Sequence, residues 1–172
     1  MSDLLVRLYD LPDLARKVAV LKRKRIGIRR VLPPEQHLVT TWVGCKFSAG
    51  WGGEVTKAMA NTPVSCFIAT RGKQLLGFAC YDATCRGYFG PTGVDEAARG
   101  QGVGTALLWV TLQAMAEAGY AYAVIGWAGP VAFYRRTVNA IVIPGSSPGI
   151  YRGLLTDRVL KGVVSRPRHG RN

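Results

Sequence analysis

The middle of the chain carries short apolar runs separated by turn residues, a pattern typical of an antiparallel meander. Runs rich in β-branched and aromatic residues predict strands over 64–70, 74–82 and 87–94. The tripeptide Arg71-Gly72-Lys73 supplies a tight turn between the first two. Further strands are predicted over 4–8, 27–32, 120–126, 140–143 and 150–155, the last one after a turn rich in proline and glycine at 144–149.

Apolar residues at helical spacing predict helices on both sides of this meander. The longest covers 103–118, where a narrow polar stripe recurs every four residues and nearly all other positions are apolar. Such a helix packs against a sheet over most of its circumference. Other helices are predicted over 14–23, 34–47 and 129–137, and a short one ending near Ala60 follows a glycine-rich loop at 48–53.

The composition of the 172 residues fits one globular domain with a substantial core, since 48% are hydrophobic and 19% are charged. No clean stretch of 18 apolar residues occurs, and the first residues lack the pattern of a secretory signal, so no membrane association is expected. The four cysteines form no Cys-x-x-Cys pair, and no histidine lies at ligand spacing. This disfavours a metal site and favours a reducing, cytoplasmic location.

The net charge of +13 is concentrated at the two ends of the chain. Nine basic residues lie within 1–36 and six within 152–172. Such ends suit a polyanionic partner such as RNA, a ribosome or an anionic lipid surface. Because no aromatic or Gly-Arg interleaving marks a track for single strands, a solvated surface with a disordered basic tail at 161–172 is favoured.

The segment from Arg99 to Thr105 combines glycines at 100, 102 and 104 between a predicted strand and the longest predicted helix. Bare backbone N–H groups at the start of a helix converge on an anion, typically a phosphate. The Walker A pattern is excluded because no lysine follows Gly104. The Gly-x-Gly-x-x-Gly fingerprint is excluded because its last position is Thr105 or Leu107. An ordinary glycine-rich turn is the alternative.

The pattern Arg99-x-x-Gly102-x-Gly104 after an aliphatic strand resembles the pyrophosphate loop of the GNAT superfamily of acetyl-CoA-dependent N-acetyltransferases. The order of predicted elements from residue 28 onward is similar to that family over about four-fifths of the chain. The resemblance implies an α/β (α+β) fold whose mixed, mostly antiparallel sheet splays around an acyl-CoA site. It divides the chain into an extra N-terminal strand–helix element packed on the domain (1–26), the acetyltransferase domain (27–160) and the tail (161–172).

The resemblance also implies how acetyl-CoA would be bound without a metal. The N–H of Val94 would polarise the thioester carbonyl and hold the oxyanion, beside a small neighbour in Gly93. The loop would hold the pyrophosphate through the backbone of residues 101–105, with Arg99 adding a cation. The implied cofactor-binding set is Gly93, Val94, Arg99, Gly100, Gln101, Gly102, Val103, Gly104 and Thr105.

The segment Phe133-Tyr134-Arg135-Arg136 resembles the family's tyrosine-bearing helix, which implies that Tyr134 is the general acid for the thiolate. The alternative is a tyrosine that anchors the helix to the core. A base is needed for the amine, and Glu54 ranks first among Glu54, Asp82, Asp95 and His37. For each of these four residues the alternative is an ordinary structural role or a solvated position on the surface.

Two positions depart from the family pattern: Trp127 stands where an asparagine is frequent, and Asn139-Ala140 replaces a Gly-Phe pair. Asn139 tolerates the left-handed conformation that the glycine provides. The walls of the acceptor pocket are expected among the aromatic residues Trp42, Phe47 and Trp51 and the turn at 146–151, although core packing and a simple hairpin explain them equally well.

The sequence therefore predicts a cytoplasmic N-acetyltransferase that transfers an acetyl group from acetyl-CoA to an amine by direct attack in a ternary complex. The acceptor is a small-molecule or protein amine that the sequence does not identify. Two alternatives remain: a non-catalytic acyl-CoA sensor, and an RNA- or ribosome-associated protein that uses its basic ends. The resemblance hints at a homodimer.

Overall fold

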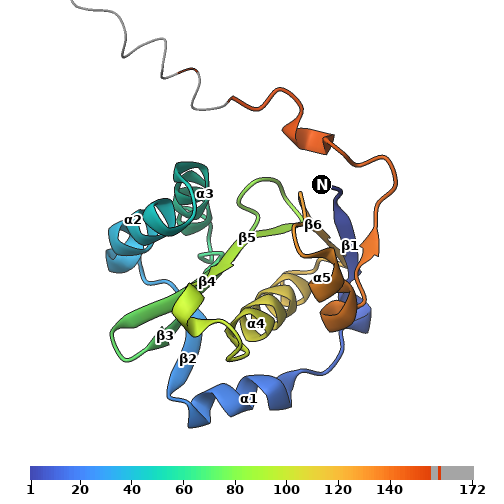
Figure 1. Cartoon of the computed structure of the whole chain (residues 1–172). Coiled ribbons are helices and arrows are strands. Elements are labelled where there is room, and N and C mark those ends of the chain that lie inside the picture. The colour runs from blue at the N-terminus through green and yellow to red at the C-terminus, as the bar shows by residue number, and fades with distance from the viewer. Residues whose placement is uncertain (156–158, 160–172) are drawn as a thin grey trace, which may run out of the picture.

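Seven strands form one sheet in the computed structural model of the chain, which describes residues 1–155 and residue 159 (Figure 1). Their order across the sheet is β2-β3-β4-β5-β6-β1-β7, and all neighbours are antiparallel except β5 and β6. The strands are β1 (Leu4–Arg7), β2 (Ile26–Arg30), β3 (Cys66–Arg71), β4 (Gln74–Tyr81), β5 (Tyr88–Val94), β6 (Tyr122–Ile125) and β7 (Ile141–Val142).

Helices cover both faces of this sheet, and each face has its own core (Figure 1). The helices are α1 (Ala15–Arg23), α2 (Gln36–Lys46), α3 (Ala49–Met59), α4 (Val103–Glu117) and α5 (Val131–Val138). Because side chains alternate along a strand, β3 sends Phe67 to the core under α4 and Ile68 to the core under α2 and α3. The predicted mixed, mostly antiparallel sheet is confirmed.

The N-terminal strand β1 lies inside the sheet, between β6 and β7. Leu4 pairs with Ile125 on one side and with Val142 on the other, and the side chains of Leu4 and Val6 are fully buried. Helix α1 continues from this strand and packs against α4 and β2. The first residues therefore supply both a strand that is paired on its two edges and a support for α4.

Two predicted elements are wrong. Residues 48–53 do not form a loop, because α3 begins at Ala49 and Ser48 caps it by accepting a hydrogen bond from Trp51 N–H (3.2 Å). Gly52 serves close packing there, since a Cβ would come within 3.3 Å of the Thr40 carbonyl on α2. Residues 150–155 form no strand, because the chain turns through the short 3₁₀ helix η4 (Gly149–Tyr151), with Gly149 and Gly153 at positive φ.

The remaining predicted elements are found within a few residues of their expected bounds. Helix α4 ends before Gly119 (φ 91°), and α5 ends at Asn139, whose φ of 53° is the left-handed conformation expected of it. The predicted tail at 161–172 lies outside the described residues, as do most of the basic positions in 152–172. Among the described residues, no helix has the length and apolar content needed to cross a bilayer.

Replacing Leu4 by alanine should destabilise the whole domain, because the side chain is completely buried between neighbouring strands and α4. We expect the free energy of unfolding to fall by about 2–5 kcal/mol in urea titrations. The matched control is Leu38→Ala on α2, where the side chain is 60% exposed and the loss should stay within about 0.5 kcal/mol. Equal effects of the two substitutions would contradict the burial of Leu4 in the core.

Candidate active site

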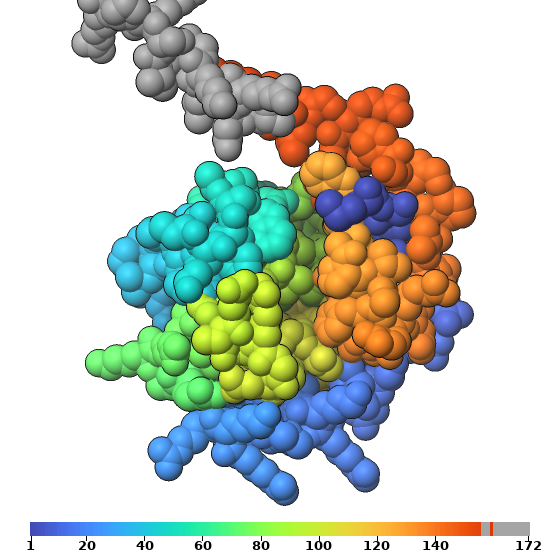
Figure 2. All heavy atoms as spheres, in the orientation of Figure 1, coloured from blue at the N-terminus to red at the C-terminus, as the bar shows by residue number. Residues whose placement is uncertain are grey.

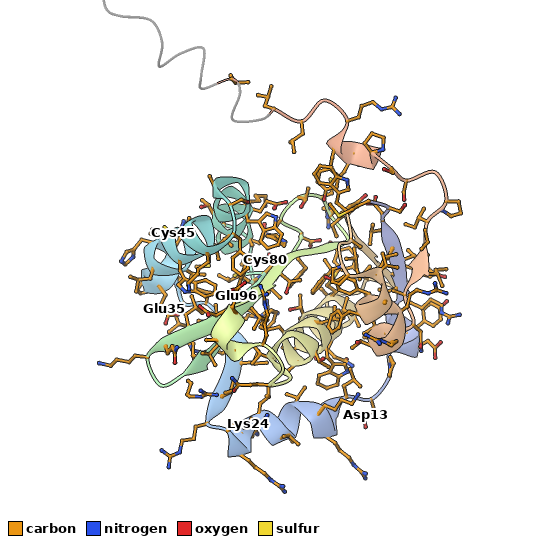
Figure 3. The ribbon with its side chains drawn as sticks, viewed as in Figure 1. Asp13, Lys24, Glu35, Cys45, Cys80 and Glu96 are labelled. Atoms are coloured by element: carbon orange, nitrogen blue, oxygen red, sulfur yellow. The ribbon has the colours of Figure 1, made fainter. Side chains whose placement is uncertain are left out.

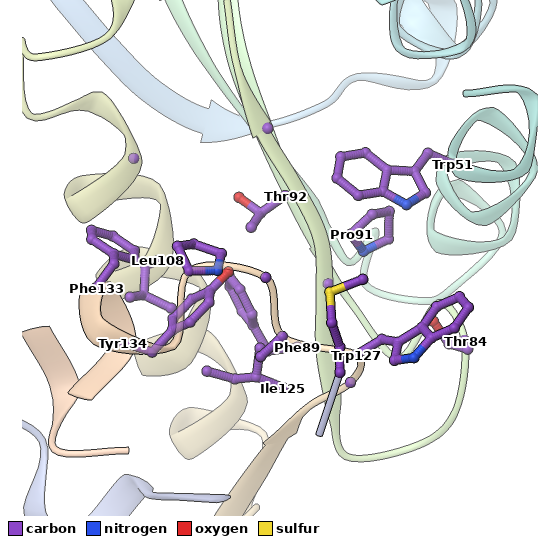
Figure 4. A pocket seen from close by; sticks show the side chains of 18 of the residues that line it. Trp51, Thr84, Phe89, Pro91, Thr92, Leu108, Ile125, Trp127, Phe133 and Tyr134 are labelled. Carbon is purple, nitrogen blue, oxygen red and sulfur yellow. The ribbon is translucent and has the colours of Figure 1, made fainter. Parts of the chain in front are cut away.

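The parallel strands β5 and β6 pair over only two positions, Tyr88 with Val124 and Phe89 with Ile125. Beyond that point they separate, and a cavity of about 490 Å³ opens between residues 90–94 of β5 and the segment 126–130 that follows β6 (Figure 4). The surface of the molecule is hollowed between α3 and this segment, as the space-filling view shows (Figure 2). The predicted splayed sheet is therefore present, and the opening lies in the middle of the sheet.

The glycine loop leads directly into α4 at one end of this cavity. Gly100 (φ 73°) and Gly102 (φ 90°) both have left-handed backbones, a conformation that glycine adopts at no steric cost. The first backbone hydrogen bond of α4 is donated by Ala106 to the Gly102 carbonyl (3.1 Å). The amides of residues 103–105 precede that ladder and lie at the positive end of the helix dipole, as an anion site requires.

Three cations surround this loop, and two of them come from distant parts of the sequence. Arg99 lies beside Glu96 (3.3 Å) and is largely exposed. Arg71 donates to the Gln101 side-chain oxygen (2.6 Å), and Lys24 donates to the Gln101 carbonyl (3.2 Å). Figure 3 shows Lys24 at the end of α1, near the loop. Sequence reasoning missed Lys24 and Arg71, because only the fold brings the end of α1, the end of β3 and the loop together.

The open edge of β5 presents the amide of Val94 to the cavity. The N–H of Asp95 donates to the Leu76 carbonyl on β4 (2.8 Å). Since successive N–H groups of a strand point to opposite edges, the Val94 N–H points to the edge from which β6 has departed. The neighbouring Gly93 lies against the ring of Phe47, which leaves no room for a Cβ. Both Gly93 and Val94 line the cavity.

Tyr134 lies on α5 and lines the cavity on the side of α4 (Figure 4). Its side chain is 5% exposed, and its ring packs edge-on against Phe89 and Phe133. Burial raises the pKa of the Tyr134 hydroxyl from 10.0 to about 12, so the group keeps its proton at neutral pH. Tyr134 therefore packs in the core and also borders the cavity, and its role as general acid stays a prediction.

Glu54 lines the same cavity from α3, and its carboxylate accepts a hydrogen bond from the Thr84 hydroxyl. Burial raises the pKa of Glu54 above its ordinary value, and the Thr84 hydrogen bond lowers it by less. The other three candidates do not line the cavity. Asp82 is held by Gly87 N–H and the Tyr120 hydroxyl, Asp95 by Lys46 and Ala97 N–H, and His37 is exposed on α2.

Aromatic residues line the cavity beyond Glu54. Trp51 of α3 lines the cavity directly. Trp42 and Phe47 do not line it, and both pack against Phe78 in the core. Trp127 and Tyr151 stack at 4.8 Å with an angle of 11° between their planes. Tyr151 belongs to the turn at 146–151, for which a pocket wall and a simple hairpin are the two interpretations, and its side chain lines the cavity.

The carboxylate of Asp3 holds the segment after β6 in place. This residue is 4% exposed and accepts hydrogen bonds from Trp127 N–H (2.8 Å) and the Tyr88 hydroxyl (3.4 Å). Trp127 has a positive φ of 48°, a costly conformation that this bond helps to maintain. Sequence reasoning missed Asp3, because nothing in its local pattern signals a partner 124 residues away.

Among the described residues, no group of three or more His, Cys, Asp or Glu side chains is arranged to hold a metal ion. Among the described residues that line the cavity, the polar groups are backbone amides, hydroxyls, indole N–H groups and the carboxylate of Glu54, and the loop beside it adds the nearby cations Arg99, Lys24 and Arg71. This set can bind an anion at one end, polarise a carbonyl at its centre and accept a proton at the other end.

A family model described as "Acetyltransferase (GNAT) family" matches residues 37–137, which is more than half of the chain. No curated protein matches the chain significantly. Among solved structures, a glucosamine N-acetyltransferase region of a fungal multi-domain β-N-acetylglucosaminidase has a TM-score of 0.68 at 14% identity, covering 83% of this chain and 19% of that one.

Two further structures have the same fold. A GCN5-related N-acetyltransferase from Sphaerobacter thermophilus has a TM-score of 0.58 at 15% identity, and the match covers 83% of this chain and 48% of the Sphaerobacter chain. A GNAT acetyltransferase from Brucella melitensis in complex with acetyl-CoA has a TM-score of 0.53 at 20% identity, and the match covers 69% of this chain and 86% of the Brucella chain. The chain thus spans less than half the length of the first two proteins.

Replacing Glu54 by glutamine should change stability in a pH-dependent way. The pKa of Glu54 is higher in the folded protein than in the unfolded chain. The protonated carboxyl therefore stabilises the fold fully at pH values below the unfolded-state pKa, and this stabilisation is lost as the pH rises through the folded-state pKa. Glutamine stays neutral throughout. We therefore expect Glu54→Gln to gain stability relative to the parent as urea titrations move from pH 4 towards pH 8.

The exposed Glu117→Gln on α4 is the matched control for this series. Any pH dependence of its stability difference from the parent is subtracted from that of Glu54→Gln. A Glu54→Gln difference that stays constant with pH would show that the Glu54 carboxyl is not desolvated.

Proposed function

The chain belongs to the acetyltransferase (GNAT) family, and on that premise we propose that it transfers an acetyl group from acetyl-CoA to a primary amine by direct attack in a ternary complex. The observation that carries the proposal is the cavity between β5 and β6, which has an amide-rich helix start at one end and a carboxylate at the other. Acetyl-CoA supplies an acetyl group activated as a thioester.

The fit to this cosubstrate rests on backbone groups. The amides of residues 103–105 lie ahead of the α4 ladder and would hold the diphosphate, with Arg99 nearby. Lys24 and Arg71 add positive charge around the same loop. The open edge of β5 would pair with the amide groups of the pantetheine arm, in place of the strand pairing that ends at Phe89. An apolar wall of Leu108, Pro130 and Phe133 suits the rest of the arm.

The Val94 N–H would polarise the acetyl carbonyl and then hold the oxygen as it becomes negative. The amine nitrogen attacks the carbonyl carbon, the C–N bond forms, and the C–S bond breaks to release the thiolate. A single oriented donor of this kind is worth about 10²–10³ in rate in enzymes that carry out acyl transfer. The donor is main chain, so it needs no particular side chain at position 94.

Tyr134 would act on the leaving sulfur. A phenol with a pKa of about 12 is a weaker acid than a thiol, whose pKa is about 8.5. Full proton transfer from Tyr134 to the thiolate is therefore unfavourable, and the general-acid role becomes donation of a hydrogen bond that stabilises the developing charge. The proton that the sulfur finally takes comes from solvent or from the amine.

Glu54 would remove the proton that the amine must lose. Its pKa is raised by burial, which makes the carboxylate a stronger base than an exposed one. The Thr84 hydroxyl fixes its orientation. Contact of the basic ends with a polyanion remains a separate prediction, for which the site offers no argument.

Tyr134→Phe should lower kcat by about 10–10³-fold and leave the Kd for acetyl-CoA nearly unchanged, because it removes a donor needed mainly in the transition state. Release of thiol followed with a chromogenic reagent measures the first quantity, and calorimetry measures the second. The matched control is Tyr9→Phe, since Tyr9 is exposed and does not line the cavity. Full activity of Tyr134→Phe would remove the assigned role.

Gly104→Asp should weaken acetyl-CoA binding by at least about tenfold, because it places a carboxylate at the start of α4 where the diphosphate would lie. Gly104→Asn is the matched neutral control of nearly equal size. A Cβ at this position meets only the Val94 side chain at 3.5 Å, so both variants should fold. Unchanged affinity of the aspartate variant in calorimetry would overturn the assignment of this loop.

A further inference from the structure

The cavity has a second end, which the coenzyme-binding groups do not occupy. We call it the acceptor end and define it by Trp51, Glu54, Thr84, Trp127 and Tyr151. These residues come from α3, from the β4–β5 loop and from the segments after β6 and β7. Figure 4 shows Trp51, Thr84 and Trp127 on the side of β5 opposite to Phe133 and Tyr134.

The rings at the acceptor end are held in fixed positions from behind. Trp51 stacks on Phe47 at 5.3 Å, and Phe47 is itself wedged against Gly93. Trp127 stacks flat on Tyr151, while its main chain is held in a left-handed conformation by the buried Asp3 carboxylate. Yet the Trp127 side chain remains 42% exposed. A large ring that is rigidly placed and only partly covered is available to a ligand.

The charge of the acceptor end is opposite to that of the chain. Among the described residues that line the cavity, Glu54 has the one charged side chain and no lysine or arginine side chain takes part, while Met1 adds its uncharged side chain and its main chain to the same lining. The chain as a whole carries a net charge of +13. An amine approaching as an ammonium ion therefore meets a carboxylate and aromatic faces, both of which attract cations. A carboxylate or phosphate on the same molecule would meet Glu54 and be repelled.

We infer that the acceptor is a monoamine carried on a flat apolar body, with its ammonium group at Glu54 and its body against Trp127 and Trp51. The inference rests on the proposed function and narrows its substrate class. A polyhydroxylated amine fits less well, because its hydroxyls would face aromatic carbon with few polar partners. An acidic or phosphorylated amine is disfavoured by charge.

Three matched amines test this assignment on the full chain with saturating acetyl-CoA. 2-Phenylethylamine carries the ring and the amine, L-phenylalanine adds a carboxylate beside the same amine, and ethanolamine lacks the ring. We expect kcat/KM for 2-phenylethylamine to exceed each of the other two by about tenfold or more. Glucosamine serves as the polyhydroxylated comparison and should fall with the poor substrates.

The variant Trp127→Leu separates recognition from catalysis. It should raise KM for 2-phenylethylamine several-fold, with little change for ethanolamine and none in acetyl-CoA affinity. Trp109→Leu is the control, because Trp109 lies on α4 and bonds to the Pro12 carbonyl away from the cavity. Equal or better use of L-phenylalanine, ethanolamine or glucosamine would overturn the inference, as would a Trp127→Leu effect that is the same for all amines.

A binding measurement keeps this result distinct from failure of the proposed function. Tryptophan fluorescence of the CoA complex should change saturably with 2-phenylethylamine, and less so in Trp127→Leu. Selective binding of 2-phenylethylamine without acetylation of any amine would support the inferred class of ligand and overturn the proposed acetyl transfer. Acetylation confined to polar amines would sustain transfer and overturn the ligand class. Neither binding nor acetylation would overturn both.

Discussion

The early separation of β5 from β6 is the constraint on which the rest of the site depends. A strand in the middle of a sheet normally has both edges paired, because buried N–H and C=O groups without partners are costly. Here pairing stops after Phe89, and the remaining edge of β5 faces a cavity. The surrounding elements keep that edge open: Gly93 lies against Phe47 on one face, and Asp3 fixes the segment after β6 through Trp127.

The N-terminal residues connect this opening to the stability of the fold. Asp3 holds the segment after β6, Leu4 fills the core between β6 and β7, and Lys24 reaches the loop in front of α4. A segment that reads as an addition to the family pattern thus contributes to both ends of the cavity. Its effect on the site acts through strand pairing and through two polar contacts.

Most elements that depend on local pattern could be predicted from the sequence. Apolar runs between turn residues identified β3 to β5, apolar residues at helical spacing identified α4, and the glycine spacing at 100–104 identified the loop. The pattern failed at 48–53, where glycine density suggested a loop but served close packing of α2 against α3. It also failed for Asp3, Lys24, Arg71 and the stacked pair of Trp127 and Tyr151, since these act through neighbours that only the fold brings near.

The two ends of the cavity differ in what they are made of. The groups proposed for the coenzyme are mostly peptide amides, fixed by strand geometry and by two left-handed glycines. The acceptor end is built from side chains on segments outside the central strands. Under the proposed function, substitutions there would alter the choice of acceptor without disturbing the main-chain groups at the other end, so the scaffold could serve new acceptors without being rebuilt.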